Sequence, residues 1–166
     1  DIYPADFGWT PDWREPEERI DWWYHNMDSV TGAGVAEVTN QLLFDDEVGY
    51  QATRALHDLA RDPDNRPWLL VTSFTHPHDP YVARQRFWDL YQGSASLEPK
   101  VGPIAFAAQD PHSQRLMLAC DYARSSVTAD DVRRSRRAYF ANVSYLDEKV
   151  GELLGSLRRT RMLDDT

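Results

Sequence analysis

The fold is decided by the stretch Trp68-Leu69-Leu70-Val71-Thr72-Ser73-Phe74-Thr75, which His76-Pro77-His78-Asp79-Pro80-Tyr81 follows directly. The first of these stretches is apolar almost throughout, as in a strand that is covered on both faces of a parallel α/β sheet. Ligands of such sheets gather at the carboxyl ends of the strands. The polar stretch therefore lies where a binding site is expected.

Helices are predicted on both sides of this strand. Residues 44–61 show helical apolar spacing, and the acidic run at 45–47 supplies an N-terminal cap and favourable charge. Thr128 with Asp131 forms a capping box, from which a long helix is predicted to about Met162. Its predicted apolar stripe comprises Val132, Phe140, Val143, Leu146, Val150, Leu153 and Leu157.

The remaining chain is predicted to be mostly irregular. Residues 1–43 are expected to form a long structured loop with one short element near 20–24, because prolines interrupt any helix there. Residues 82–127 are expected to hold one short helix, at 82–91. One strand cannot make a sheet, so the predicted class is α/β with an incomplete sheet. We expect residues 1–166 to be an internal portion of one larger domain, in which 1–43 is an aromatic-rich, substrate-side loop region and 44–166 forms helix, strand, loops and long helix.

The composition of the chain excludes several classes of binding partner and site. The net charge of −9 argues against a nucleic-acid backbone, and the basic run at 133–137 is predicted to be a solvated helix face. No apolar run approaches the roughly 20 residues of a membrane helix, so no membrane partner is expected. The single cysteine, Cys120, excludes an internal disulfide and a cysteine-rich zinc site.

Two histidines after the strand are candidate functional groups. In an extended segment alternate residues point the same way, so His76 and His78 could face one ligand. Imidazoles there could bind a metal, donate to an anion, or serve as acid and base. The alternative is that they only form hydrogen bonds within the loop. A metal site would need a further ligand, which the sequence does not identify.

Aromatic residues gather near the start of the chain: Trp9, Trp13, Trp22, Trp23 and Tyr24, with His25 beside them. Ring faces recognise a quaternary ammonium ion, which has no N–H to donate. The alternative is that these rings only pack a long loop against the body of the protein.

Cys120 and Arg124 have the spacing of the sulfatase nucleophile motif, Cys-x-Pro/Ala-x-Arg, whose cysteine becomes formylglycine. Tyr122 occupies the position of Pro or Ala, so the motif fails and Cys120 is interpreted as structural.

Several stretches resemble the choline sulfatases of the alkaline-phosphatase-like sulfatase family. They are residues 1–13, 20–26, 73–81, 134–151 and 158–166. The resemblance implies the α/β/α sandwich of that family and a sulfuric ester hydrolase that cleaves choline sulfate.

The resemblance also implies roles for particular residues. His78 would be the catalytic histidine that contacts the sulfate group, with His76 as a further substrate-binding residue. Trp9 would present its aromatic face to the trimethylammonium group, and His25 would line the substrate pocket. The formylglycine nucleophile and a divalent metal, calcium or magnesium or manganese, would come from outside this sequence, so this chain alone should be inactive.

The full-length enzyme is expected to be a cytoplasmic homo-oligomer that acts on a small molecule. Two other readings stay open on the same residues. One is a phosphonate or phosphodiester hydrolase of the same superfamily, since fold does not fix the substrate. The other is a non-catalytic module that binds quaternary ammonium ions.

Overall fold

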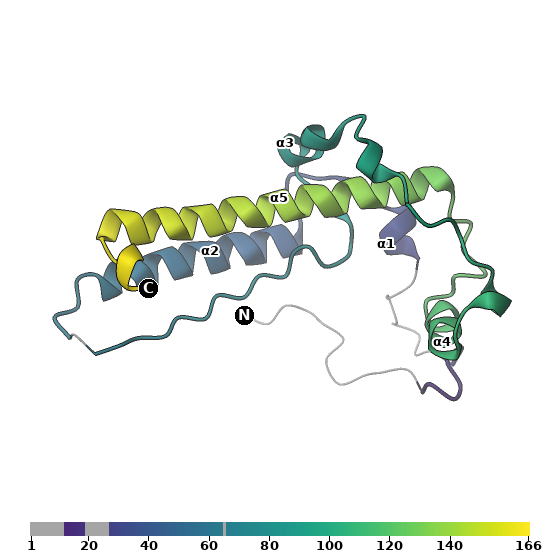
Figure 1. Cartoon of the computed structure of the whole chain (residues 1–166), viewed down its shortest axis with the longest axis horizontal. Helices are drawn as coiled ribbons and strands as arrows, with labels where there is room; N and C mark the ends of the chain where they lie inside the picture. Colours follow the sequence, from purple (N-terminus) through teal and green to yellow (C-terminus); the bar gives the residue numbers. More distant parts are fainter. Residues whose placement is uncertain (1–11, 19–26, 65) are drawn as a thin grey trace.

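The computed structural model describes residues 12–18, 27–64 and 66–166, and helices dominate this part of the chain (Figure 1). Its α-helices are α1 (Asp28–Thr31), α2 (Asn40–Leu59), α3 (Gln85–Trp88), α4 (Pro111–Ala119) and α5 (Ala129–Thr160). Its strands are β1 (Gly34–Val35) and β2 (Val82–Ala83), which pair in parallel. Single 3-10 turns are formed by Asp89–Tyr91, Ala95–Leu97, Phe106–Ala108 and Leu163–Asp165. None of the described helices combines the length and apolar composition that crossing a bilayer requires.

Helix α2 begins earlier than the sequence predicted. Its N-cap is Thr39, whose Oγ1 accepts a hydrogen bond from the Leu42 backbone N–H at 3.1 Å. The acidic run at 45–47 was predicted to be the cap, and that prediction was wrong. Asp45 and Asp46 lie inside the helix and accept hydrogen bonds from groups on other elements. Partners from distant parts of the chain therefore outweigh the local preference of aspartate for a helix start.

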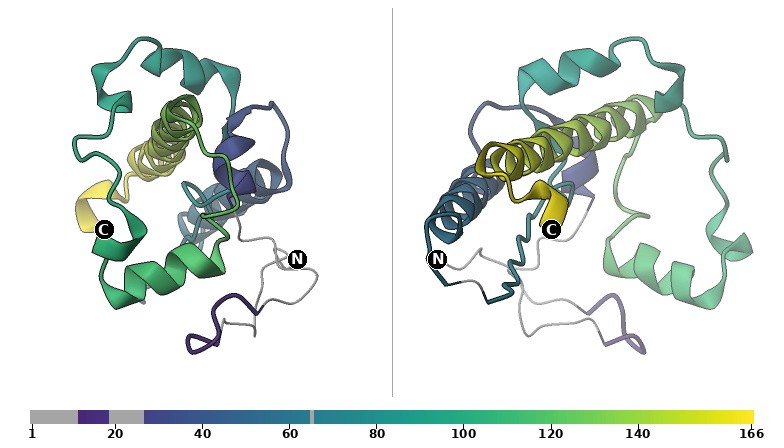
Figure 2. Two further views of the ribbon diagram at one scale, coloured as in Figure 1. Left: turned by 90° about the vertical axis from the view of Figure 1, so that its right-hand side faces the viewer. Right: turned by 60° about the vertical axis from the view of Figure 1, so that its left-hand side comes forward.

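The predicted capping box of α5 is confirmed. Thr128 Oγ1 accepts from the Asp131 backbone N–H at 3.2 Å, and Asp131 Oδ2 accepts from the Thr128 backbone N–H at 2.8 Å. The helix ends at Thr160, and Arg161 follows in the left-handed region with φ of 61°. Figures 1 and 2 show α5 running alongside α2.

The buried face of α5 differs from the predicted apolar stripe. Val143 and Val150 remain 40% and 43% exposed. The residues of α5 that are buried are Ser135, Ala138, Ala141, Asn142, Tyr145, Ser156 and Leu157. Most of these side chains are small, which lets a helix approach its neighbours closely. Tyr145, Ala138 and Ala141 join Leu42, Ala83 and Phe87 in one core cluster.

The extended segment 68–75 lies beside α2 and makes no strand pairing within the described residues (Figure 1). Leu69 and Val71 are 88% and 78% exposed, whereas Phe74 between α2 and the loop is partly buried. The prediction of a paired, doubly covered strand is therefore not met by this part of the chain. The parallel pair β1–β2 was not predicted, because two-residue strands carry no periodic signal.

Residues 82–127 are more regular than predicted. Their first part is β2, α3 and a 3-10 turn instead of one helix at 82–91, and α4 was missed. Asp110 caps α4 by accepting from the backbone N–H groups of His112 and Ser113, and Pro111 occupies the first turn. This pairing of cap and proline is a known helix start. Figure 2 shows α4 set apart from the α2–α5 pair.

The basic run on α5 is only partly a solvated face. Arg137 Nε donates to the Trp88 carbonyl at 2.8 Å, and its guanidinium lies 4.5 Å from the centroid of a Trp88 ring. Arg136 donates to the Ser96 carbonyl at 2.9 Å. These two arginines hold the 85–97 segment against α5, which corrects the prediction for them.

Candidate functional site

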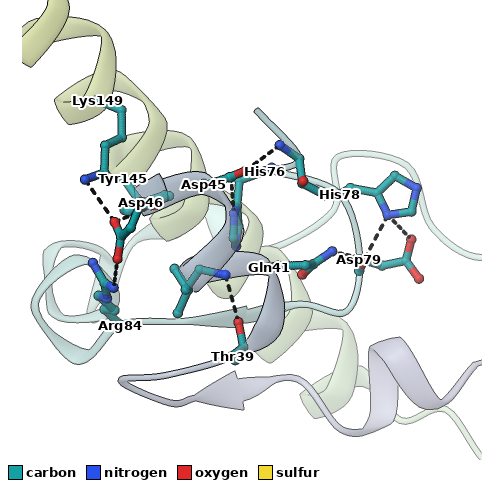
Figure 3. A network of polar contacts seen from close by, with 12 residues as sticks. Thr39, Gln41, Asp45, Asp46, His76, His78, Asp79, Arg84, Tyr145 and Lys149 are labelled. Carbon is teal, nitrogen blue, oxygen red and sulfur yellow. Dashed lines mark hydrogen bonds and ion pairs between the residues drawn. The ribbon is translucent and has the colours of Figure 1, made fainter. Parts of the chain in front are cut away.

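The loop from Thr75 to Tyr81 connects the extended segment to β2 and lies against α2 (Figure 3). The peptide bonds before Pro77 and Pro80 are both cis. The His78 backbone N–H donates to the Thr75 carbonyl at 3.1 Å, which closes a turn around the first proline. The turn separates the two candidate histidines and gives them different surroundings.

His76 is buried against α2 and α5. Its Nδ1 lies 2.6 Å from Asp45 Oδ2, and neither side chain is exposed to solvent. Its ring meets the Tyr145 ring edge-on, with centroids 5.1 Å apart. Because a carboxylate accepts at Nδ1, that nitrogen carries the proton in this arrangement. The other ring nitrogen, Nε2, is buried and has no hydrogen-bond partner within the described part of the chain.

Asp45 also holds the backbone of the loop. Its Oδ1 accepts from the Thr75 N–H at 2.7 Å, and its Oδ2 accepts from the His76 N–H at 3.0 Å. Burial by itself would raise the pKa of Asp45. The hydrogen bonds from the His76 side chain and from the two backbone N–H groups outweigh burial and lower the pKa below its ordinary value. Asp45 is therefore a charged acceptor that fixes the amino-terminal side of the loop.

His78 is presented on the opposite side of the turn, with 56% of its side chain exposed. Its Nδ1 lies 2.8 Å from the Asp79 carbonyl oxygen and 3.0 Å from Asp79 Oδ1. Figure 3 shows the His78 ring turned toward Asp79 and away from the Asp45–His76 pair. His76 and His78 were predicted to face the same side, because alternate residues of an extended segment do so. In the structure their imidazoles occupy separate environments, one buried and one at the surface.

A second carboxylate on α2, Asp46, ties the site to the rest of the fold. It accepts from Arg84 Nη2 at 2.5 Å, from Tyr145 Oη at 3.0 Å and from Lys149 Nζ at 2.9 Å. Partial burial raises the pKa of Asp46, but hydrogen bonds from Arg84, Lys149 and Tyr145 lower it overall to about 2.

Tyr145 donates to Asp46 and is also close enough to Asp45 to be affected by its charge. Burial, followed by the charges of Asp46 and Asp45, raises the pKa of Tyr145 well above its ordinary value. The phenol therefore stays protonated and donates to Asp46. Tyr145 and Lys149 join α5 to this carboxylate of α2, whereas Arg84 joins it to the start of α3.

Two of the predicted site residues, Trp9 and His25, lie outside the described residues. So do Trp22, Trp23 and Tyr24 of the aromatic cluster. Trp13 is described, and its ring meets that of His112 edge-on with centroids 5.4 Å apart. This contact with the first turn of α4 fits the packing role that is one of the two readings of the aromatic cluster.

The described residues do not fit a metal ion, and Cys120 does not fit a formylglycine precursor. No group of three or more His, Cys, Asp and Glu side chains in the described ranges is placed to hold a metal ion. Cys120 is the C-cap of α4, and Tyr122 stands where the nucleophile motif requires Pro or Ala. No chemical step is therefore assigned to either group in this chain.

Sequence reasoning missed the residues that hold the loop. Asp45 was read as a helix-start charge, and Gln41 and Ser29 carried no motif. A signal for Asp45 was present: it lies three residues after Leu42, on the helical face that Ala52 and Leu56 continue, where an unpaired carboxylate would be costly. Ser29 gave no comparable signal, because its partner lies far away in sequence.

Comparison with known proteins gives a consistent result. The sulfatase family model matches residues 5–166. The chain is 68% identical over 169 aligned residues to the choline-sulfatase of Rhizobium meliloti (strain 1021), covering all of this chain and 33% of that protein. It is 28% identical over 174 residues to the multifunctional alkaline phosphatase superfamily protein PehA of Trinickia caryophylli, covering 96% of this chain and 34% of that protein.

A more distant relative is the arylsulfatase of Clostridium perfringens (strain 13 / Type A). It is 26% identical over 106 residues, which cover 64% of this chain and 21% of that protein. The chain thus spans 21–34% of the length of these curated relatives. Because the family model covers nearly every residue of it, this chain belongs to the sulfatase family.

Proposed function

We propose that the full-length protein hydrolyses choline sulfate to choline and sulfate. The observation that carries the proposal is the 68% identity to the Rhizobium meliloti choline-sulfatase across the whole of this chain. Since the chain spans 33% of that relative, the activity is proposed for the longer polypeptide and not for these residues alone.

His78 is proposed to contact the sulfate group. Its imidazole is exposed at the end of an extended segment, where ligands of α/β proteins gather. An N–H of this ring can donate to a sulfuryl oxygen or to the leaving oxygen, where negative charge develops during ester cleavage. His76 is proposed to contribute to substrate binding indirectly, from the buried side of the loop, because its side chain is not exposed to solvent. His76 would help to fix the position of the loop, and thereby the position of His78.

Trp9 and His25 are proposed to recognise the choline end of the substrate. Choline carries a trimethylammonium group, which offers no hydrogen-bond donor, so an indole face is a suitable partner. Both residues lie outside the described part of the chain, and their role rests on the resemblance of the stretches at 1–13 and 20–26.

Residues beyond this chain are proposed to supply a formylglycine nucleophile and a divalent metal. The full-length protein is further proposed to be a cytoplasmic homo-oligomer. Metal analysis and light scattering on the purified full-length protein test the metal and the oligomer directly. A protein that is monomeric, or that is active after complete removal of divalent metals, would contradict these two points.

The choline-binding proposal is tested with Trp9→Ala in the full-length protein. A cation–π contact is worth about 0.5–2 kcal/mol, so KM for choline sulfate should rise about 2- to 30-fold. The matched substrate is dimethylbutyl sulfate, in which an uncharged quaternary carbon replaces the ammonium nitrogen. Its KM should change little, because the lost contact acts on the charge.

Trp13→Ala is the control for this experiment, because Trp13 lies nearby in sequence and packs on His112. It should leave the ratio of the two KM values unchanged. Equal effects of the two tryptophan substitutions on that ratio would remove Trp9 from the site.

The sulfate end is tested by His78→Ala and by substrate comparison. Loss of a positioned proton donor should lower kcat for choline sulfate about 100-fold or more. The wild-type protein should turn over choline sulfate faster than phosphorylcholine. The reverse preference would favour a phosphoester hydrolase of the same superfamily.

A further inference from the structure

Asp79 contacts the imidazole of His78 with two of its oxygens. The backbone carbonyl lies 2.8 Å from Nδ1, and carboxylate Oδ1 lies 3.0 Å from it. Both oxygens are acceptors, so Nδ1 must carry a proton for either contact to be favourable. The neighbouring residue therefore selects the ring tautomer and leaves Nε2 on the edge of the ring that faces away from Asp79.

A contact between adjacent residues at the surface could be incidental, since exposed ion pairs contribute little. Asp79, however, is itself held from two helices. Its Oδ2 accepts from Ser29 Oγ of α1 at 2.7 Å, and its carbonyl oxygen accepts from Gln41 Nε2 of α2 at 2.6 Å. Gln41 is buried. These partners are 50 and 38 residues away in sequence, so the folded structure sets the orientation of Asp79 before any ligand arrives.

We propose that Asp79 is the positioning residue for His78, and that Ser29 and Gln41 hold Asp79 in place. This inference rests on the proposed function, because it assigns His78 Nε2 as the nitrogen that meets the sulfate ester. The arrangement resembles the way a second group orients an active-site or metal-bound histidine through its other nitrogen. Ordering the ring in advance spares the entropy that an exposed imidazole would otherwise lose on binding.

Steady-state kinetics on the full-length protein test the proposal. Asp79→Ala should lower kcat for choline sulfate about 10- to 100-fold and change KM by less than about 3-fold, since a small misplacement of a reacting group mainly affects the transition state. Ser29→Ala should lower kcat about 3- to 10-fold, because Asp79 keeps its contact with Gln41. Ser29→Thr retains the hydroxyl and should restore kcat to within about 2-fold of wild type.

Ser113→Ala is the matched control. Ser113 Oγ donates to Oδ2 of Asp110, the N-cap of α4, so the substitution removes the same kind of serine–aspartate bond at a different helix. It should leave kcat and KM unchanged.

The tautomer of the His78 ring can be measured separately from activity. It would not change if Asp79 only stabilised the fold. Nitrogen NMR of histidine-labelled protein, with the His78 signals identified by their loss in His78→Gln, should show a proton on Nδ1 in the wild-type protein at a pH where the ring is neutral. Asp79→Ala removes Oδ1 but leaves the backbone carbonyl near Nδ1, so it should shift the population partly toward the Nε2–H form. Wild-type kcat in both Asp79→Ala and Ser29→Ala, or an unchanged tautomer in Asp79→Ala, overturns the proposal.

The two proposals fail in different ways. A wild-type protein that does not hydrolyse choline sulfate, or a His78→Ala variant with full activity, overturns the proposed function. The NMR experiment does not depend on turnover, so it decides in either case whether Asp79 orients the ring.

Discussion

Asp45 shows how much one buried carboxylate can organise. It accepts from two successive backbone N–H groups and from the His76 imidazole, and thereby fixes where the loop leaves the extended segment. The sequence predicted that the histidines follow a strand-like segment, because apolar runs are visible locally. It did not predict that His76 is buried and His78 exposed. That difference arises from Asp45 and Tyr145, which approach from α2 and α5.

Asp45→Asn should lower the free energy of unfolding of the full-length protein by about 3 kcal/mol, because it removes the charge from a buried pair and points an amide at N–H donors. Urea unfolding measures the effect. Asp58→Asn on the same helix is the control, since Asp58 is exposed and pairs with the surface residues Arg54 and Arg61. A change of less than about 0.5 kcal/mol is expected there. Similar values for the two variants would contradict the assigned role of Asp45.

Asp46 should make stability depend on acidity. Its pKa in the folded protein is about 2, below the ordinary value of 3.8. A carboxylate whose folded pKa is lowered contributes stability above the unfolded pKa and loses that contribution as the pH falls through the folded pKa. Asp46→Asn should therefore lower the free energy of unfolding by about 2 kcal/mol at pH 7, and by progressively less between about pH 4 and pH 2.

Urea unfolding at a series of pH values measures this convergence. Glu47→Gln, at an exposed neighbouring position, should change the free energy by less than about 0.5 kcal/mol at each pH. A difference between wild type and Asp46→Asn that stays constant down to pH 2 would contradict the role of Asp46 as a charged acceptor.

At the scale of elements, the sequence predicted what local chemistry specifies. Thr128 and Asp131 predict a capping box at the start of α5, and the structure contains it. The contact face of α5 was mispredicted, because apolar size was taken as the guide to burial. The buried positions are instead Ala138 and Ala141, which join the core cluster with Leu42, Ala83 and Phe87, whereas Val143 is 40% exposed. The same reasoning overlooked α4, whose signals, Asp110 and Pro111, are capping signals without strong periodicity.

Ala141→Leu should therefore destabilise the protein by about 1–3 kcal/mol, because the larger side chain cannot fit a face that is fully buried. Val143→Leu, nearby on the same helix at an exposed position, should stay within about 0.5 kcal/mol of wild type. Thermal and urea unfolding of the full-length variants measure both values. A larger loss of stability at Val143 than at Ala141 would instead support the apolar face of α5 that was predicted from the sequence.

At the scale of the whole molecule, the described residues supply a loop and its supports but no complete reaction centre. Leu69 and Val71 on the extended segment are exposed, and the described ranges contain no paired strand beside them. The α/β class could be predicted from one apolar run between helices. The order of strands in a sheet could not, since it depends on pairings that a single segment does not encode.

The isolated chain of residues 1–166 should show no turnover of choline sulfate, whereas the full-length protein should be active. The physical reason is that the described ranges hold no metal-binding group and Cys120 lacks the nucleophile motif. Release of sulfate from choline sulfate, followed by ion chromatography, measures both. Metal-dependent turnover by the isolated chain would overturn the assignment of the nucleophile to another region.

Gln41 and Asp45 are four positions apart on α2, one helical turn, and they grip the loop at Asp79 and at Thr75–His76, on either side of His78. The rise of one helical turn, about 5.4 Å, therefore sets the spacing between the two points at which α2 holds the loop. Adding or deleting one residue of the loop between these two points would allow only one of the two contacts, that of Gln41 or that of Asp45, to form. Evolution or design can therefore vary the side chains here far more readily than the number of residues.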